Sequence, residues 1–227
     1  MTSSARLPLF PLPLVLFPGA TLPLHVFEPR YRALLADCER GDGRFGIVLS
    51  AGSEPPRAGA VGCVAELRDV VTLPDGRSNI LVEGAERFAV ARLVESETAY
   101  LVAEVRPWTD EPEPDAHDTL RTLDAGTREA FQRVARAARA IADDGDPIPD
   151  LPSDPAALSF AIAAAVELEL GTRQRLLSSR SAVARLREVH EMLTRALPGV
   201  EMRAQVHVGA RRNGHGPYAP PDAPPSA

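Results

Sequence analysis

Four aspartates lie close together in the middle of the chain, and their carboxylates are of the type that binds calcium. They are Asp143, Asp144, Asp146 and Asp150, in the run DDGDPIPD. An EF-hand loop needs oxygen ligands at alternate positions, a central glycine and a bidentate glutamate at its closing position. Here the glycine comes too early, and Asp154 occupies the closing position. We therefore interpret the run as a solvated linker and predict no metal site.

The residues suited to acid–base or nucleophilic chemistry are scattered along the chain. His190 lies on an otherwise apolar face of a predicted helix, and Ser178, Ser179 and Ser181 have no recognisable base partner. A hydrolase needs its nucleophile, base and orienting carboxylate together, and the sequence contains neither a GxSxG nor an HExxH motif. We predict no catalytic residue and no enzymatic activity. A hydrolase whose Asp, His and Ser side chains meet only after folding stays an alternative.

The sequence contains 25 arginines and no lysine. A P-loop needs a lysine on the phosphates, a Ser–Lys hydrolase needs lysine as its base, and a Schiff-base enzyme needs the free amine. Arginine cannot replace lysine in these roles, because its guanidinium stays protonated. These three chemistries are therefore excluded within the 227 residues, and no cofactor is predicted.

Charge and cysteine content indicate the compartment and the partners. The formal net charge of −6 disfavours nucleic acid, whose affinity for proteins comes largely from neutralised phosphates. The apolar segment 7–20 contains four prolines, which suit neither a signal peptide nor a membrane span. We expect a cytoplasmic protein with no membrane contact. Cys38 and Cys63 are expected to be buried thiols there, although one disulfide stays possible.

The first half of the chain has the pattern of a small β-barrel. Short apolar segments at 45–50, 61–73, 79–82, 87–90 and 100–106 are separated by turn residues. Pro74-Asp75-Gly76 predicts a tight hairpin, and Gly84 is expected to interrupt the returning strand. Pro18-Gly19 predicts a turn before a strand at 21–27. Only residues 28–40 in this half have helical spacing.

The second half has the periodicity of helices. One amphipathic helix follows Asp118, and a second, apolar nearly all round, begins after the capping pair Asp154-Pro155 and is expected to end at Gly171. A third is expected from 172 to 197, ended by Pro198-Gly199. The predicted organisation is a barrel at 1–108, an acidic Pro-rich linker at 109–118 and a helical bundle at 119–198. A tail at 199–227 completes it, disordered from about 211.

The first forty residues carry a resemblance to a known family. The run LPLFPLPLVLFPGATLPLHVFEPRYRALL resembles the opening of the substrate-recognition domain of Lon-type ATP-dependent proteases. It is more similar still to stand-alone bacterial proteins built from that domain alone. The segments FGIVL, VGCVAEL, LPDGRSNILVEGAERFAV and DPAALSFAIAAAVELELGTRQRLL fit the same pattern, so the resemblance extends over residues 7–197.

The resemblance implies an α+β fold, with an N-terminal PUA-like β pseudo-barrel followed by a C-terminal helical bundle. It also implies a non-catalytic module that binds an unfolded polypeptide or a protein partner, as an adaptor in proteolysis or quality control, without the ATPase and peptidase of the full protease. Phe17, Phe27, Tyr31 and Leu34 are the candidate peptide-binding residues, because they lie at the strand–helix junction of the motif. RNA binding, known for PUA-like barrels, is the alternative; the oligomeric state stays open.

Overall fold

The computed structural model describes residues 5–50, 52, 54–113 and 116–213. They form two compact units. The first comprises residues 1–124 and 151–189, and the second comprises residues 125–150 and 190–227. Two long helices, α2 (Ala116–Ala142) and α5 (Ala182–Asn213), each contribute to both units.

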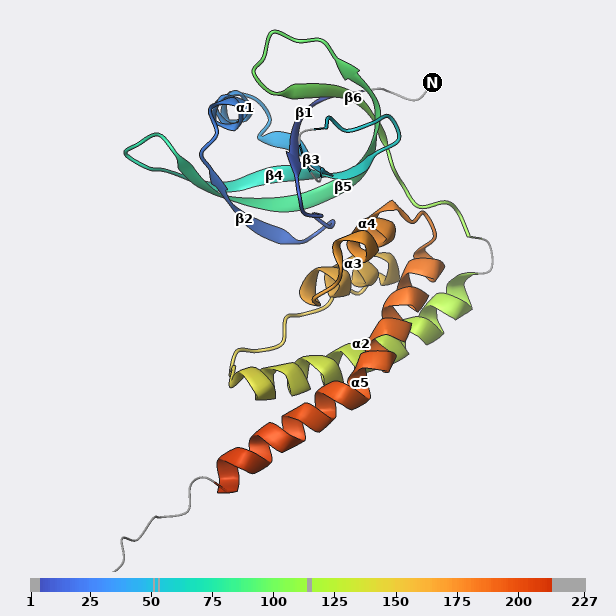
Figure 1. Ribbon diagram of the computed structural model, residues 1–227. Coiled ribbons are helices and arrows are strands. Elements are labelled where there is room, and N and C mark those ends of the chain that lie inside the picture. The colour runs from blue at the N-terminus through green and yellow to red at the C-terminus, as the bar shows by residue number, and fades with distance from the viewer. Residues whose placement is uncertain (1–4, 51, 53, 114–115, 214–227) are drawn as a thin grey trace, which may run out of the picture. The chain divides into compact units, whose positions relative to one another are not determined.

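Six strands in the first unit form one sheet that closes on itself (Figure 1). The strands are β1 (Ala5–Leu12), β2 (Thr21–Val26), β3 (Arg44–Leu49), β4 (Val61–Thr72), β5 (Ser78–Val94) and β6 (Leu101–Pro107). Their order is β2-β5-β4-β3-β1-β6, and an additional pairing of β5 with β6 closes the barrel. All pairings are antiparallel except that of β1 with β3.

Strand β5 is long enough to pair with two different strands along the same edge. Its first half pairs with β2, and its second half pairs with β6, while β4 follows it on the other side. The strand β2 therefore lies outside the closed ring, as an extension of the sheet. Inside the ring, apolar side chains from five strands form the core: Leu9, Val48, Val64, Phe88, Val90, Ala103 and Val105.

The strand positions expected from sequence are confirmed, with one difference in β5. Gly84 was expected to interrupt this strand, but β5 continues through it. The glycine is needed for close approach instead, since a Cβ there would lie 2.1 Å from the carbonyl oxygen of Phe17. Gly84 also exchanges hydrogen bonds with the turn before β2, donating to Ala20 and accepting from Gly19. It thus fixes the loop of residues 13–20 against the barrel.

Helix α1 (Pro29–Arg40) has proline in its first turn, as predicted, and packs one face on the barrel. Helix α3 (Pro155–Ala165) begins at Asp154, whose carboxylate accepts from the backbone N–H of Ala157 at 2.8 Å. This confirms the predicted cap. Its nearly uniform apolar sequence is explained by burial, since Leu158 and Ile162 are fully covered.

The helical ends in the second half differ from those predicted. Helix α3 ends at Ala165, and α4 (Leu170–Ser178) includes Gly171 in its first turn. The single helix expected at 172–197 is therefore two, because Ser179 is extended and α5 (Ala182–Asn213) starts after it. The helix after Asp118 is α2 (Ala116–Ala142), which includes that residue in its first turn.

The second unit contains the later part of α2 beside the later part of α5. Arg133 forms two hydrogen bonds of 3.0 Å with Glu201, and Asp143 pairs with Arg211, so the two segments run parallel. Contrary to the sequence prediction, α5 does not end at Pro198 but continues to Asn213. One interior proline costs about 3 kcal/mol; beyond it Ala204 is buried and Glu201 pairs with Arg133 of α2.

The predicted tail therefore begins as helix, and this helix extends past residue 211, where disorder was expected to begin, to Asn213. Residues 214–227 of the tail lie outside the described residues. Residues 109–113 of the predicted linker are held by hydrogen bonds. The backbone of Glu111 donates to Arg180, and Glu113 accepts from Ser181 and Val183. Helix α3, which is strongly apolar, and helix α4 belong to the first unit together with the barrel, and not to the second unit.

Candidate functional site

The outer face of the sheet at β2, β5 and β4 exposes apolar side chains. Pro23 on β2 is aligned with Leu81 on β5, and in the next row His25 and Asn79 are aligned with Val71 on β4. Aligned residues share a face, and diagonal neighbours lie within reach of long side chains. We call Pro23, Phe27, Val71 and Leu81 the apolar patch; all four are exposed.

Phe27 extends this patch beyond the end of β2. Its ring is 58% exposed and stacks on the ring of His25, with 6.0 Å between the ring centres. The Nδ1 of His25 donates to Oδ1 of Asn79 at 2.7 Å, which holds the imidazole across the two strands. An exposed aromatic side chain on a fixed support is typical of a binding surface rather than of a protein core.

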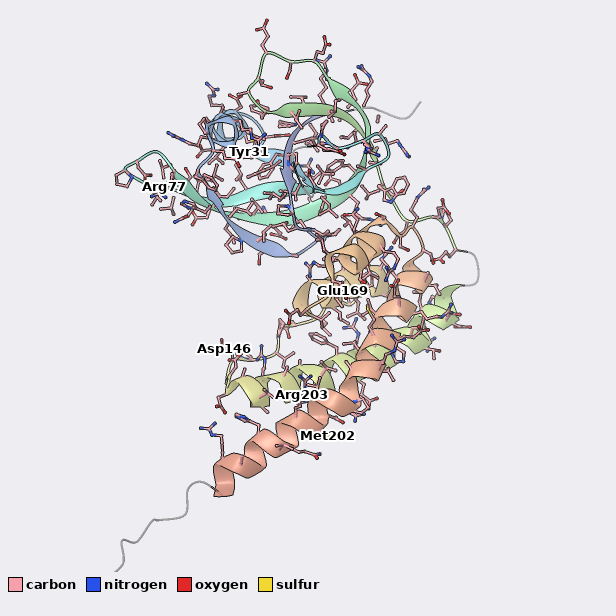
Figure 2. The ribbon with its side chains drawn as sticks, in the orientation of Figure 1. Tyr31, Arg77, Asp146, Glu169, Met202 and Arg203 are labelled. Atoms are coloured by element: carbon pink, nitrogen blue, oxygen red, sulfur yellow. The ribbon has the colours of Figure 1, made fainter. Side chains whose placement is uncertain are left out.

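Charged side chains surround the patch, and several of them pair with one another. Arg68 bonds Glu83 at 2.8 Å and Glu66 at 3.1 Å, while Arg77 at the hairpin tip bonds its neighbour Asp75 at 2.6 Å (Figure 2). Arg30 bonds Glu28 at 2.9 Å beside Phe27 in the same way. The exposed carboxylate of Asp69 on β4 lies in the same row as Leu81. The surface therefore presents apolar groups beside internal ion pairs and one further carboxylate, which favours a ligand segment with few charges.

Of the four residues predicted to bind peptide, only Phe27 is exposed. Phe17 is fully buried and packs on Phe160 of α3, with 6.0 Å between ring centres. Tyr31 is buried on the inner face of α1 (Figure 2), stacked on Phe10 at 4.0 Å, and Leu34 is buried on the same face. The motif is therefore mainly a packing motif, in which these three side chains belong to the core.

The largest group of buried charges lies elsewhere in the same unit. Arg87 of β5 and Arg185 of α5 both bind the carboxylate of Asp110, and we call these three residues the arginine–aspartate cluster. Arg185 forms two hydrogen bonds of 2.7 Å to Asp110 and one of 2.9 Å to Ser159. Its guanidinium lies over the ring of Phe160 at 4.1 Å.

This cluster holds elements together and offers no reactive group. Arg87 also donates to the carbonyls of Leu177 and Ser179, at the end of α4. Burial raises the pKa of the Asp110 carboxyl, but hydrogen bonds and charge from Arg185 and Arg87 outweigh it, so the pKa lies below its ordinary value. Asp110 is thus a counter-ion, which joins β5, the segment after β6, α4 and α5.

The other residues considered for chemistry are equally unsuited to it. Cys38 and Cys63 are free thiols, and burial raises the pKa of each to about 12, so neither is a nucleophile at neutral pH. Asp143 pairs with Arg211 and bonds His207. Among the residues that the structure describes, no three His, Cys, Asp or Glu side chains are grouped to hold a metal ion.

Sequence reasoning missed Pro23, Val71 and Leu81 of the patch, and the whole arginine–aspartate cluster. The alternation within β4 and within β5, with the register that the hairpin between them sets, could have placed Val71 and Leu81 on one face. Nothing in the sequence could have grouped Arg87, Asp110 and Arg185, since up to 75 positions separate a bonded pair.

Comparison with known proteins assigns the fold to a family. The family described as the ATP-dependent protease La (LON) substrate-binding domain matches residues 6–195. This chain belongs to that family. Within the described ranges, no helix of this LON substrate-binding domain is long and apolar enough to cross a membrane.

Individual relatives agree with this assignment. The Lon protease of Trichlorobacter lovleyi is 30% identical over 213 residues, which cover 90% of this chain and 26% of that protein. The Lon protease of Anaeromyxobacter dehalogenans is 28% identical over 197 residues, 84% of this chain and 23% of the relative. The LON substrate-binding domain described here thus spans about a quarter of the length of these relatives.

Two solved structures share the fold. A crystal structure of a Lon N-terminal domain protein from Xanthomonas campestris has a TM-score of 0.55 and 28% identity, covering 82% of this chain and 96% of that one. The N-terminal domain of the Mycobacterium avium complex Lon protease has a TM-score of 0.60 and 20% identity, with 84% and 98% covered. The predicted PUA-like α+β fold is confirmed.

Proposed function

We propose that this chain is a non-catalytic module that binds unfolded polypeptide through the apolar patch, as an adaptor in cytoplasmic proteolysis or quality control. The observation that carries the proposal is the exposed ring of Phe27, supported by His25 and continued by Leu81 and Val71. Unfolded chains expose the apolar side chains that folded proteins bury, so such a surface distinguishes the two. Membership of a substrate-binding family supports the same role.

A non-catalytic role is supported by the chemistry of the described side chains. The sequence has no lysine for a P-loop or a Ser–Lys dyad. The two thiols are buried, and the best-connected carboxylate, Asp110, is neutralised by Arg87 and Arg185. Recognition without turnover is therefore the activity that we propose.

RNA binding, the alternative role for a PUA-like barrel, has no comparable support. Of the arginines near the patch, Arg30, Arg68 and Arg77 are each bonded to a carboxylate, while Arg32 lies against Gly76 at the hairpin tip. A protein that binds phosphates needs cations free to neutralise them. The net charge of −6 also opposes such binding.

The test is a titration of this chain into a fluorescently labelled polypeptide that cannot fold, followed by anisotropy. A folded relative of that polypeptide serves as the control ligand. We expect saturable binding of the unfolded form alone, and Phe27→Ser to weaken it about tenfold, the equivalent of losing roughly 1.4 kcal/mol. Equal binding of both forms, or of neither, would contradict the proposal.

The matched control variant is Met202→Ser. Met202 is an apolar side chain on α5 in the second unit (Figure 2), and it is 66% exposed, similar to Phe27. Removing it changes the exposed apolar surface by a comparable amount but leaves the patch intact. Binding should therefore be unchanged in Met202→Ser. Equal weakening in both variants would show that any exposed apolar group suffices.

A further inference from the structure

The edge of β2 is a second feature of the region around the patch. In the described part of the chain β2 pairs with β5 alone, so its other side has no strand partner. The side chains of Thr21, Pro23 and His25 are exposed along it. An unpaired edge presents backbone N–H and C=O groups that an extended chain can bond.

Two observations show which residues direct their backbone groups to this open side. Gly84 of β5 donates to the carbonyl of Ala20, so Ala20 faces β5. Facing alternates along an antiparallel strand, which turns Thr21, Pro23 and His25 away from β5. Pro23 agrees with this independently, because a proline has no N–H and is tolerated where none is needed for pairing.

We propose that the open edge of β2 takes up one extended segment of an unfolded polypeptide as an additional strand. This rests on the proposed function and states its binding mode. Thr21 and His25 each offer an N–H and a C=O to the added strand, and Pro23 offers a C=O. Alternate side chains of the added strand continue the outer face and contact the apolar patch at Pro23 and Phe27.

The residues of this edge also favour one kind of binding segment over others. A second copy of β2 paired here would bring two Pro23 residues into one short ladder, so two backbone N–H donors would be missing. Proline on an edge strand acts against such self-pairing. The last 14 residues of this chain include five prolines and are poorly suited to a ladder. A foreign segment with apolar residues at alternate positions, few charges and no proline fits both the edge and the apolar patch.

The first experiment changes the ligand backbone and leaves the protein intact. The probe is a labelled eight-residue peptide of alternating Val and Thr, with Glu at each end for solubility, compared with versions N-methylated at one or the other alternate set of amides. Only the set that faces β2 donates to it. We expect the peptide methylated at one set to bind at least tenfold more weakly than the peptide methylated at the other. The set whose methylation weakens binding shows whether the added strand runs parallel or antiparallel to β2.

The second experiment removes one donor from the edge. Thr21→Pro deletes an N–H that faces away from β5, so pairing with β5 is retained, and Thr21→Val is the control that keeps the N–H. We expect unchanged unfolding midpoints and a fivefold to tenfold weaker affinity in Thr21→Pro only, as for one lost hydrogen bond. Because the methylation series uses the unaltered protein, it decides the matter even if Thr21→Pro fails to fold.

The outcomes separate the two proposals. Binding of the unfolded polypeptide with equal affinity for both methylated sets overturns strand addition and leaves the proposed function standing. A dimer that Thr21→Pro abolishes, and that the peptide does not displace, also overturns strand addition. Absence of any binding to the unfolded polypeptide overturns both.

Discussion

The apolar patch exposes hydrophobic side chains to water, whereas the arginine–aspartate cluster of the same unit buries two arginines against a partly buried aspartate. Phe27 is 58% exposed, and the side chain of Arg185 is fully buried. In the cluster each charge has its partners, so burial is compensated and the elements are joined. In the patch Phe27 stays more than half exposed although it stacks on His25, so the cost of this exposure stays uncompensated until a ligand binds.

This difference separates the residues that stabilise the fold from the residues that bind the ligand. Residues of the cluster should control the free energy of unfolding without affecting ligand affinity, and residues of the patch should do the reverse. Exposed apolar groups contribute little to folding, because they remain in contact with water in the native state. Partnered buried charges contribute through the penalty that follows when one partner is removed.

The largest effect is expected at the cluster. Asp110→Asn should lower the free energy of unfolding by about 3–5 kcal/mol, because it leaves the buried guanidinium groups of Arg87 and Arg185 without a counter-ion. Urea denaturation measures this, with Glu111→Gln as the control. Glu111 pairs with Arg180 at the surface, and its loss should cost under about 1 kcal/mol. Equal losses would remove the distinction between the cluster and surface pairs.

The next effect tests whether a motif residue belongs to the core or to the binding surface. Leu34 is only 1% exposed, on the inner face of α1. Leu34→Ala should lower the free energy of unfolding by about 2–5 kcal/mol, because it removes buried apolar surface and leaves a cavity. The affinity of the folded fraction for unfolded polypeptide should not change. A weaker affinity at unchanged stability would instead place Leu34 in the binding surface.

Acid should weaken the cluster in a defined range of pH. The pKa of Asp110 is lowered in the native state, so its contribution to stability is present above the ordinary aspartate pKa and is lost as pH falls below about 4. Unfolding free energies measured between about pH 5 and 2 should fall more steeply for the unaltered chain than for Asp110→Asn. Identical slopes would show that other carboxyl groups account for the acid sensitivity.

The smallest effect on stability is expected at the patch itself. Phe27→Ser should change the free energy of unfolding by less than about 0.5 kcal/mol, as for most exposed positions. The same variant carries the largest expected loss of peptide affinity. Thermal unfolding, scanned beside Leu34→Ala, completes the comparison; a shift as large as that of Leu34→Ala would mean that the ring of Phe27 supports the fold.

Much of the fold followed from local signals in the sequence. The turn at Pro18-Gly19, the hairpin at Pro74-Asp75-Gly76 and the cap at Asp154 depend on neighbouring residues, so they could be predicted. Helix ends were less predictable. Pro198 and Gly199 are strong local stop signals, yet α5 continues through them, and beyond them Glu201 pairs with Arg133 of α2 and Arg211 pairs with Asp143 just after α2.

The family motif, the absence of lysine-dependent chemistry and most strand positions followed from residue types and local patterns. The packing of distant segments was needed to show that Phe17, Tyr31 and Leu34 are buried while Phe27 is exposed, since all four belong to the same motif. It alone brought Arg87 and Arg185 to Asp110 across 23 and 75 positions. Exposure and charge pairing depend on contacts between distant segments, and local sequence does not encode which segments will meet.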